Sequence, residues 1–184
     1  GLRERRLGKV GKAGGPEAEF REKSLQVIQQ LGLSKDVVFT DYISEGDLPA
    51  YYSGAECFIL PSFYEGFGFP PLEAMSCGCP VIVSNAASLP EITGEAAIKI
   101  NPHDVDELVD STRKVLTSKG LREKMIQGGF KQARKFSWEH TAQETLQVYQ
   151  EAEEKLKSHK ARRHFGHLAF SSSAGGNPQK PKEG

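Results

Sequence analysis

The sequence carries no excess of charge of either sign and no long apolar run. Its 24 basic and 24 acidic side chains cancel, so the formal net charge at neutral pH is zero. A general nucleic-acid-binding protein usually presents a net basic surface, and this balance therefore argues against a nucleic-acid partner. A membrane-spanning helix needs about 20 consecutive apolar residues. No run approaches that length and no secretory signal is visible at the start, so we expect a soluble protein.

Cysteine and histidine are also scarce. The three cysteines are an odd number and do not form a disulfide framework. Cys77 and Cys79 lack the two-residue spacing and the second ligand cluster of a structural zinc site. None of the five histidines has a partner at metal-binding or catalytic spacing. We therefore expect no metal and no cofactor, and a reduced cytoplasmic setting.

The length limits the number of domains. A chain of 184 residues with 38% hydrophobic content can bury the core of one domain but hardly of two. We predict an irregular basic segment over residues 1–15, a folded domain over residues 16–153, and a basic, disordered tail over residues 154–184. Two interpretations of the basic run in this tail stay open. It is either a solvated segment or a weak peripheral contact with anionic lipid headgroups.

Residues 60–84, LPSFYEGFGFPPLEAMSCGCPVIVS, predict a strand, a glycine loop, a helix, a turn and a second strand. The loop over residues 64–69 contains two glycines, which allow close approach of a ligand to the backbone. Pro70 and Pro71 can begin the helix because their missing N–H groups belong to the unpaired first turn. Gly78 ends it. The expected order therefore points a helix N-terminus, with its partial positive charge, at the loop.

This geometry favours recognition of a phosphate by main-chain amides. Because the two prolines offer no N–H, the donors to an anion must come from Gly66, Phe67 and Gly68, with Leu72 as a further candidate. Glu65 and Glu73 lie on either side of these donors, eight positions apart.

Two carboxylates beside a phosphate would repel it if they touched it. They are therefore expected to accept hydrogen bonds from neutral hydroxyl groups next to the phosphate. A nucleotide-sugar has hydroxyls on both sides of its diphosphate, so two separated glutamates suit one ribose and one hexose.

The segment EGFGFPPLE, with AMSCGCPVIVSNAASLPEI after it, resembles the E-x(7)-E segment of the retaining family 4 glycosyltransferases, which have the two-domain GT-B fold. The flanking segments VVFTDYISEGDLPAYYSGAECFILPS, INPHDVDELVDSTRKVL and KFSWEHTAQETLQVYQEA follow the same pattern. The resemblance therefore covers roughly residues 14–152. In the family the E-x(7)-E segment belongs to the donor-binding C-terminal domain.

The resemblance implies a role for each matching residue. Glu65 would be the catalytic residue that contacts the donor sugar, and Glu73 would contact the ribose. The loop amides of Gly66, Phe67 and Gly68 would contact the sugar and the diphosphate.

Two further segments border the donor in the family. The turn with Tyr42 and Ile43 is placed near the nucleobase, although this chain has Asp41 where the family commonly has glycine, and Asp41 is equally typical of a plain turn. Residues 85–92 are predicted to form a loop in which Ser88 or Glu91 would touch the donor sugar. A plain loop without such a contact is the alternative.

The elements alternate between strand and helix, which predicts an α/β fold with a parallel sheet covered by helices on both faces. The resemblance implies a Rossmann-like sheet in the order 3-2-1-4-5-6. The sequence before residue 16 does not suit the first strand, so we expect a donor-binding domain truncated on its N-terminal side. The missing strand would lie at the centre of the sheet, between the second and the fourth. Either the fourth strand then exposes an apolar edge, or the sheet closes over the gap.

Local signals predict several helix starts. Ser44 with Asp47, and Asp104 with Glu107, resemble capping boxes, and Ser137 is a candidate cap of the last helix. The last helix is predicted to pack through four positions: Trp138, Thr141, Leu146 and Tyr149.

The function implied is transfer of a hexose, with mannose one candidate, from a nucleoside diphosphate sugar to a hydroxyl acceptor with retention of configuration. The acceptor would be a glycan or a lipid-linked molecule, so the protein would be cytoplasmic or peripheral to a membrane. No divalent metal is implied. Because the acceptor domain is absent, we expect the chain alone to transfer little or no sugar. A non-catalytic nucleotide-sugar-binding module and an inactive truncated fragment remain as alternatives, and a sugar-nucleotide epimerase fits the loop and helix less well.

Overall fold

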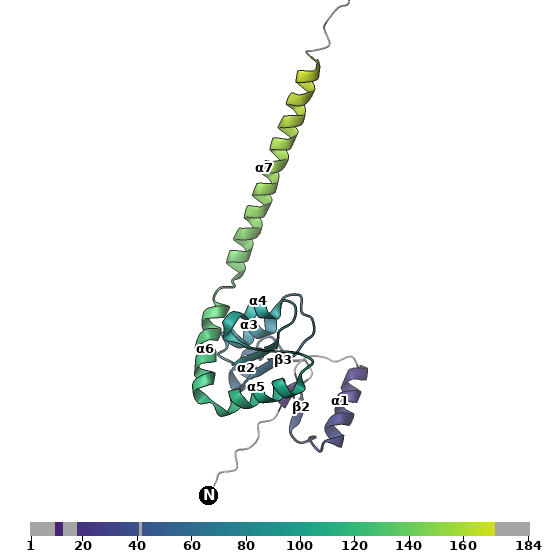
Figure 1. Cartoon of the computed structure of the whole chain (residues 1–184), viewed down its shortest axis with the longest axis vertical. Helices are drawn as coiled ribbons and strands as arrows, with labels where there is room; N and C mark the ends of the chain where they lie inside the picture. Colours follow the sequence, from purple (N-terminus) through teal and green to yellow (C-terminus); the bar gives the residue numbers. More distant parts are fainter. Residues whose placement is uncertain (1–9, 13–17, 41, 172–184) are drawn as a thin grey trace, which may run out of the picture. The chain divides into compact units, whose positions relative to one another are not determined.

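The computed structural model describes residues 10–12, 18–40 and 42–171 (Figure 1). It divides into two compact units, of which the first ends at Arg134 and the second begins at Lys135. The predicted irregular N-terminal segment is wrong at residues 10–12, which form a strand, and its other residues lie outside the described ones, as does Asp41.

Strands and helices alternate along the first unit, as the sequence predicts. The elements are β1 (Val10–Lys12), α1 (Ala18–Gln30), β2 (Val37–Phe39), α2 (Leu48–Gly54), β3 (Phe58–Leu60), α3 (Phe69–Ser76), β4 (Val81–Ser84), α4 (Leu89–Thr93), the 3-10 helix η1 (Gly94–Ala96), β5 (Ile98–Ile100), α5 (Val105–Thr117) and α6 (Lys119–Ala133). All strand pairs among the described residues are parallel. The predicted α/β fold with a parallel sheet is therefore confirmed.

The described strands form two separate sheets. β1 pairs with β2, with Val10 opposite Val37. β3, β4 and β5 form the second sheet, with Phe58 opposite Val81 and Ile82 opposite Ile98. In chain order, β1 to β5 correspond to the second to sixth strands of the expected order 3-2-1-4-5-6, and no described strand corresponds to the first. Among the described strands, no ladder of hydrogen bonds joins β1 or β2 to β3, so the sheet does not close over this gap.

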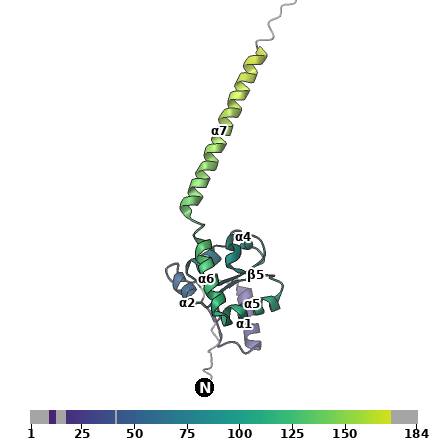
Figure 2. The same cartoon turned by 60° about the vertical axis from the view of Figure 1, so that its left-hand side comes forward.

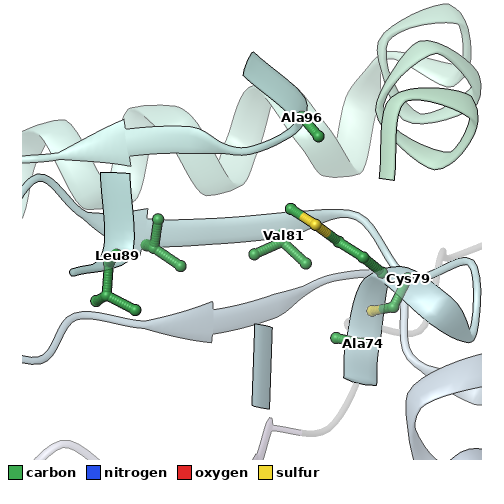
Figure 3. Packing of buried hydrophobic residues seen from close by; sticks show 7 residues of the cluster. Ala74, Cys79, Val81, Leu89 and Ala96 are labelled. Carbon is green, nitrogen blue, oxygen red and sulfur yellow. The ribbon is translucent and has the colours of Figure 1, made fainter. Parts of the chain in front are cut away.

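The core of the first unit lies on both faces of the three-stranded sheet. β4 is buried along its whole length, and alternate side chains of a strand point to opposite faces. Val81 and Val83 accordingly pack in one cluster with residues of α3 and α4, whereas Ile82 packs in another with residues of α5 and α6. Figure 3 shows Val81 with neighbouring side chains of the first cluster. The helices α3 to α6 contact this sheet or one another, and Figure 2 shows α4, α5 and α6 around β5.

The contact of α3 with α6 depends on a small residue. Gly129 of α6 is buried, and a Cβ atom added there would lie 3.2 Å from Cγ of Met75. The glycine therefore lets the backbone of α6 approach α3, the helix that follows the glycine loop.

Both predicted capping boxes form only in part. The N–H of Glu107 donates to Oδ1 of Asp104 at 2.9 Å, as predicted, but the Glu107 carboxylate accepts from the N–H of Asn101 at 2.7 Å. The N–H of Asp47 donates to Oγ of Ser44 at 3.3 Å. The Ser44 hydroxyl in turn donates to the Asp47 carboxylate at 2.7 Å, so in both boxes the returning carboxylate binds a different donor from the expected one.

The segment predicted as a loop over residues 85–92 contains helix α4. Four residues form the turn after β4, and the helix then begins at Leu89, whose side chain is fully buried. Burial of this apolar side chain explains why the segment folds back onto the core instead of remaining an open loop.

The second unit consists of helix α7 (Trp138–Ser171) and the short segment before it. The N–H of His140 donates to Oγ of Ser137 at 3.1 Å, which confirms the predicted cap. No helix in the described part of the chain, α7 included, is long and apolar enough to cross a membrane.

The predicted packing of this helix through Trp138, Thr141, Leu146 and Tyr149 stays a prediction, because α7 is described as a unit by itself. The predicted disorder of the tail is wrong in part. Residues 154–171 are helical instead of disordered. Good helix formers dominate the start of this region, and Lys157 pairs with Glu153 one turn earlier at 2.7 Å. Residues 172–184 of the predicted tail lie outside the described residues.

Candidate functional site

The loop between β3 and α3 holds its shape through a glycine that no other residue can replace without strain. Gly68, the residue before α3, has φ +105° and ψ +53°, in the left-handed region. A Cβ atom added there would lie 2.9 Å from Cδ2 of Leu89. Both the backbone angles and the close approach of α4 therefore require glycine at this position.

The first turn of α3 contains Phe69 and the two prolines, as the sequence predicts. Leu72 is the fourth residue of the helix. The N–H of a fourth helical residue is the first that has a carbonyl acceptor within the helix. The side chain of Leu72 is buried, at 8% exposure. An anion at Leu72 would therefore compete with the helix for the N–H, and the assignment of Leu72 as a donor stays a prediction.

Two loop amides have no acceptor. Among the described residues, the N–H groups of Gly66 and Gly68 donate no hydrogen bond. Gly66 is exposed, but Gly68 is buried. A buried backbone N–H without an acceptor is rare in proteins. The amide of Gly68, at the N-terminus of α3, is therefore available to a ligand. Phe67 lies between these glycines, and its ring packs against Phe69 with ring centroids 4.7 Å apart.

The carboxylate of Glu65 is also available. It makes no hydrogen bond or ion pair with any residue that the structure describes, and the side chain is partly buried. Glu65 is held instead through its backbone, because its carbonyl accepts a hydrogen bond from the Ser88 hydroxyl at 2.8 Å. The side chain therefore stays free next to Gly66.

Glu73 is bound by a residue that sequence reasoning missed. The hydroxyl of Tyr52, in α2, donates to Oε2 of Glu73 at 3.0 Å. The ring of Tyr52 packs edge-on against Phe58 of β3, with centroids 5.6 Å apart. Burial raises the pKa of the Tyr52 hydroxyl, and its hydrogen bond to Glu73 raises this pKa further, so the group remains a donor. Glu73 is exposed, and Oε1 stays available to another donor.

Ser88 contacts the loop itself. Its Oγ lies 2.8 Å from the carbonyl oxygen of Glu65 and 2.7 Å from that of Phe67. The structure thus brings together Ser88, Glu65 and Phe67, three residues that the sequence predicted for the donor site. The hydroxyl proton of Ser88 is shared between the two backbone carbonyls. This geometry does not test the predicted contact of Ser88 with the sugar.

Two other serines support the same loop and were not predicted. The hydroxyl of Ser84, at the buried end of β4, donates to the carbonyl of Ser62 at 2.5 Å. The hydroxyl of Ser62 donates to the carbonyl of Tyr64 at 3.1 Å. Only Ser84 had a usable signal, since a serine that ends an otherwise apolar strand is available to bond an adjacent loop.

The remaining predicted residues lie outside the loop segment of the sequence. Tyr42 and Ile43 follow β2, a strand of the sheet β1–β2. Tyr42 is 82% exposed and Ile43 is half-buried. Glu91 lies in the first turn of α4 with an exposed side chain. In the described part of the chain, no three histidine, cysteine or carboxylate side chains are grouped so that they could hold a metal ion.

Comparison with known proteins places this loop in a family. The family model of the glycosyl transferases group 1 matches residues 10–132. The O-antigen chain mannosyltransferase B of Escherichia coli is 44% identical over 111 residues, which make up 60% of this chain and 29% of that protein. The serotype-specific mannosyltransferase WbdA of Escherichia coli is 39% identical over 127 residues, or 68% of this chain and 16% of that protein.

A solved structure shows the same fold. The sucrose-phosphate synthase of Thermosynechococcus elongatus superposes with a TM-score of 0.72 at 27% identity, over 79% of this chain and 38% of that chain. The chain therefore spans less than a third of the length of the two curated relatives and less than half of this structure. Because the family model covers more than half of the chain, including the whole glycine loop, the chain belongs to the group 1 glycosyltransferases.

Proposed function

We propose that this chain is the donor-binding part of a retaining glycosyltransferase. The donor would be a nucleoside diphosphate sugar, and the reaction would transfer a hexose to a hydroxyl group with retention of anomeric configuration. Family membership supports the reaction class. One observation carries the assignment of the site: the N–H groups of Gly66 and Gly68, in front of α3, have no acceptor among the described residues.

These amides suit the diphosphate. A backbone N–H at a helix N-terminus attracts negative charge through both its own dipole and that of the helix. Charge builds up on the departing diphosphate as the bond to the sugar breaks, so fixed donors aimed at it stabilise the transition state. The cost of leaving the amide of Gly68 buried and unpaired in the free protein would be recovered when the donor binds.

The two carboxylates suit the hydroxyl groups on either side of the diphosphate. Glu65 has a free carboxylate directly before the amides, and we assign it the contact with the donor sugar and the catalytic role. Glu73 retains Oε1 after its bond to Tyr52, and we assign it the ribose. The exposed ring of Tyr42, with Ile43, would contact the nucleobase.

Mannose is the hexose that the relatives favour. The two curated relatives described above, at 44% and 39% identity, are both mannosyltransferases. The acceptor would be a hydroxyl group of a glycan or of a lipid-linked molecule. No residue assigned here requires a metal ion.

Ligand-induced melting shifts test this function. A ligand that binds only the folded state stabilises it by mass action, so the matching nucleoside diphosphate should raise the melting temperature. The panel would comprise UDP, GDP, UDP-glucose and GDP-mannose on the full chain, with the free hexoses as controls. A rise with at least one diphosphate, and a further change with one diphosphate sugar, is expected. If no nucleotide shifts the melting temperature at millimolar concentration, the proposed function is wrong.

A further inference from the structure

The contact of Ser88 with the glycine loop is maintained by an unusual backbone. Ala87, the residue before it, has φ +50°, in the left-handed region that residues with a Cβ atom rarely adopt. It is the one residue other than glycine with a positive φ in the described part of the chain. The chain thus accepts a disfavoured conformation next to the serine that bonds the carbonyls of Glu65 and Phe67.

These two hydrogen bonds determine where the loop amides point. A trans peptide group is planar, and its C=O and N–H point in opposite directions. The described chain contains no cis peptide. The carbonyl of Glu65 shares its peptide group with the N–H of Gly66, and the carbonyl of Phe67 shares its group with the N–H of Gly68. When Ser88 draws both carbonyls to one side, both N–H groups must face the other side.

The same two amides are the ones that have no acceptor within the described chain. We propose that Ser88 is a positioning residue that orients the Gly66 and Gly68 amides toward the diphosphate, and that it does not bind the donor itself. This inference rests on the proposed function, because it assigns the ligand of those amides. It replaces the direct contact with the donor sugar that sequence resemblance suggested for Ser88.

The chemistry of the hydroxyl favours the indirect role. A serine has one proton to donate, and here that proton is shared between two carbonyl oxygens at 2.8 and 2.7 Å. Donation to a sugar oxygen would require Ser88 to give up one or both of these bonds and release the loop. Ser62 and Ser84 hold the earlier part of the loop in the same way, but neither bonds the carbonyl of Glu65 or Phe67.

Three variants of the full chain test the role. Ser88→Ala removes the hydroxyl and Ser88→Thr restores it. Ser53→Ala is the matched control, because the hydroxyl of Ser53 also donates to a backbone carbonyl, that of Pro49 at 2.6 Å, but within α2. Calorimetric titration with UDP or GDP, and with the corresponding diphosphate sugar, gives the dissociation constants.

Loss of one hydrogen bond corresponds to about a three- to tenfold weaker affinity. For Ser88→Ala we expect this loss for the diphosphate and for the diphosphate sugar alike, so that the ratio of the two affinities stays at its wild-type value. Ser88→Thr should recover most of the affinity, and Ser53→Ala should match the wild type. A loss confined to the diphosphate sugar would instead show that Ser88 touches the hexose and would overturn the proposal.

A measurement without ligand separates this inference from the proposed function. The heteronuclear NOE of the backbone amides of Gly66 and Gly68 should fall in Ser88→Ala, with the rest of the domain unchanged, and recover in Ser88→Thr. If these amides are equally ordered in Ser88→Ala, Ser88 does not position the loop. If the amides lose order but the wild type binds no nucleotide, the proposed function fails and the assignment of the diphosphate to these amides fails with it. A uniform loss of order throughout the domain would show a general structural role and would also overturn the proposal.

Discussion

The hydroxyl of Tyr52 lies 3.0 Å from Oε2 of Glu73, and this bond joins α2 to α3 across 21 residues of sequence. It fixes one of the two glutamates that flank the glycine loop, while the other, Glu65, stays unbound. The two acidic residues of the E-x(7)-E segment are therefore not equivalent in the structure.

Replacement of Tyr52 tests how much its hydrogen bond to Glu73 contributes to stability. Tyr52→Phe keeps the ring against Phe58 but removes the donor, so we expect a loss of about 1 kcal/mol of folding free energy near neutral pH. Because the pKa of Tyr52 is raised in the folded state, its stabilising contribution is full below pH 10 and is lost as the pH rises further. Tyr52→Phe should therefore lose less stability than the wild type at alkaline pH. Tyr51→Phe, at a neighbouring tyrosine with 53% exposure, is the control, and urea unfolding at several pH values measures both.

Substitution of Glu65 and of Glu73 should affect the binding of the diphosphate and of the diphosphate sugar differently. Glu65→Gln is expected to weaken the diphosphate sugar about tenfold and to leave the diphosphate unchanged, because it removes a charge-assisted bond to the hexose. Glu73→Gln should weaken both ligands by the same factor, because both contain the ribose. Calorimetry on the full chain gives the ratios, and equal losses for both ligands in Glu65→Gln would contradict its assigned contact with the sugar.

The glycines of the loop differ in their tolerance of a side chain. Gly68→Ala combines φ +105° with a Cβ atom 2.9 Å from Leu89, and strain of this kind costs on the order of 1–3 kcal/mol. Gly66→Ala meets no atom within 4 Å and has no positive φ, so its effect on stability should be below about 1 kcal/mol. Urea unfolding of the two variants compares them directly. Equal stabilities would show that the backbone at Gly68 is not constrained as described.

Cys79 should make the fold sensitive to alkaline pH. Burial raises the pKa of its thiol from 9.0 to about 12, and nearby Cys57 and Cys77 add to this shift. A raised pKa means that the contribution to stability is full below pH 9 and is lost as the pH rises through 12. We expect the stability of Cys79→Ala to depend less on pH in this range than that of the wild type. Urea unfolding at several pH values measures this dependence, and an unchanged slope in Cys79→Ala would contradict the effect.

Local features of the fold were predictable from the sequence because they depend on a few consecutive residues. The end of α3 at Gly78 follows from its φ of +75°, which glycine adopts without strain. The cap at Ser137 and the first turn with Pro70 and Pro71 follow from which backbone groups lack partners at a helix start. The family segment likewise led to Glu65 and the loop amides, since the whole loop is contiguous in sequence.

The bonds that hold the site were not predictable in this way. Ser88 and Glu65 are 23 residues apart, and Tyr52 and Glu73 are 21 apart. Nothing in the spacing of such residues indicates that they meet, because their approach depends on how α2 and α4 pack on the sheet. The apolar side chains of α7 meet the same limit, because a pattern such as that of Trp138 and Tyr149 indicates an apolar face but does not identify the element that covers it.

The division into two sheets has a consequence for how the fold opens. Within the described strands, no ladder of backbone hydrogen bonds links β1 or β2 to β3. The pair β1 and β2 can therefore open without breaking a backbone hydrogen bond of the sheet β3–β5, so that the two sheets need not unfold as one cooperative unit. Amide protons of residues 37–39 would then exchange with solvent through brief partial openings, whereas those of residues 81–84 would wait for the whole domain to unfold.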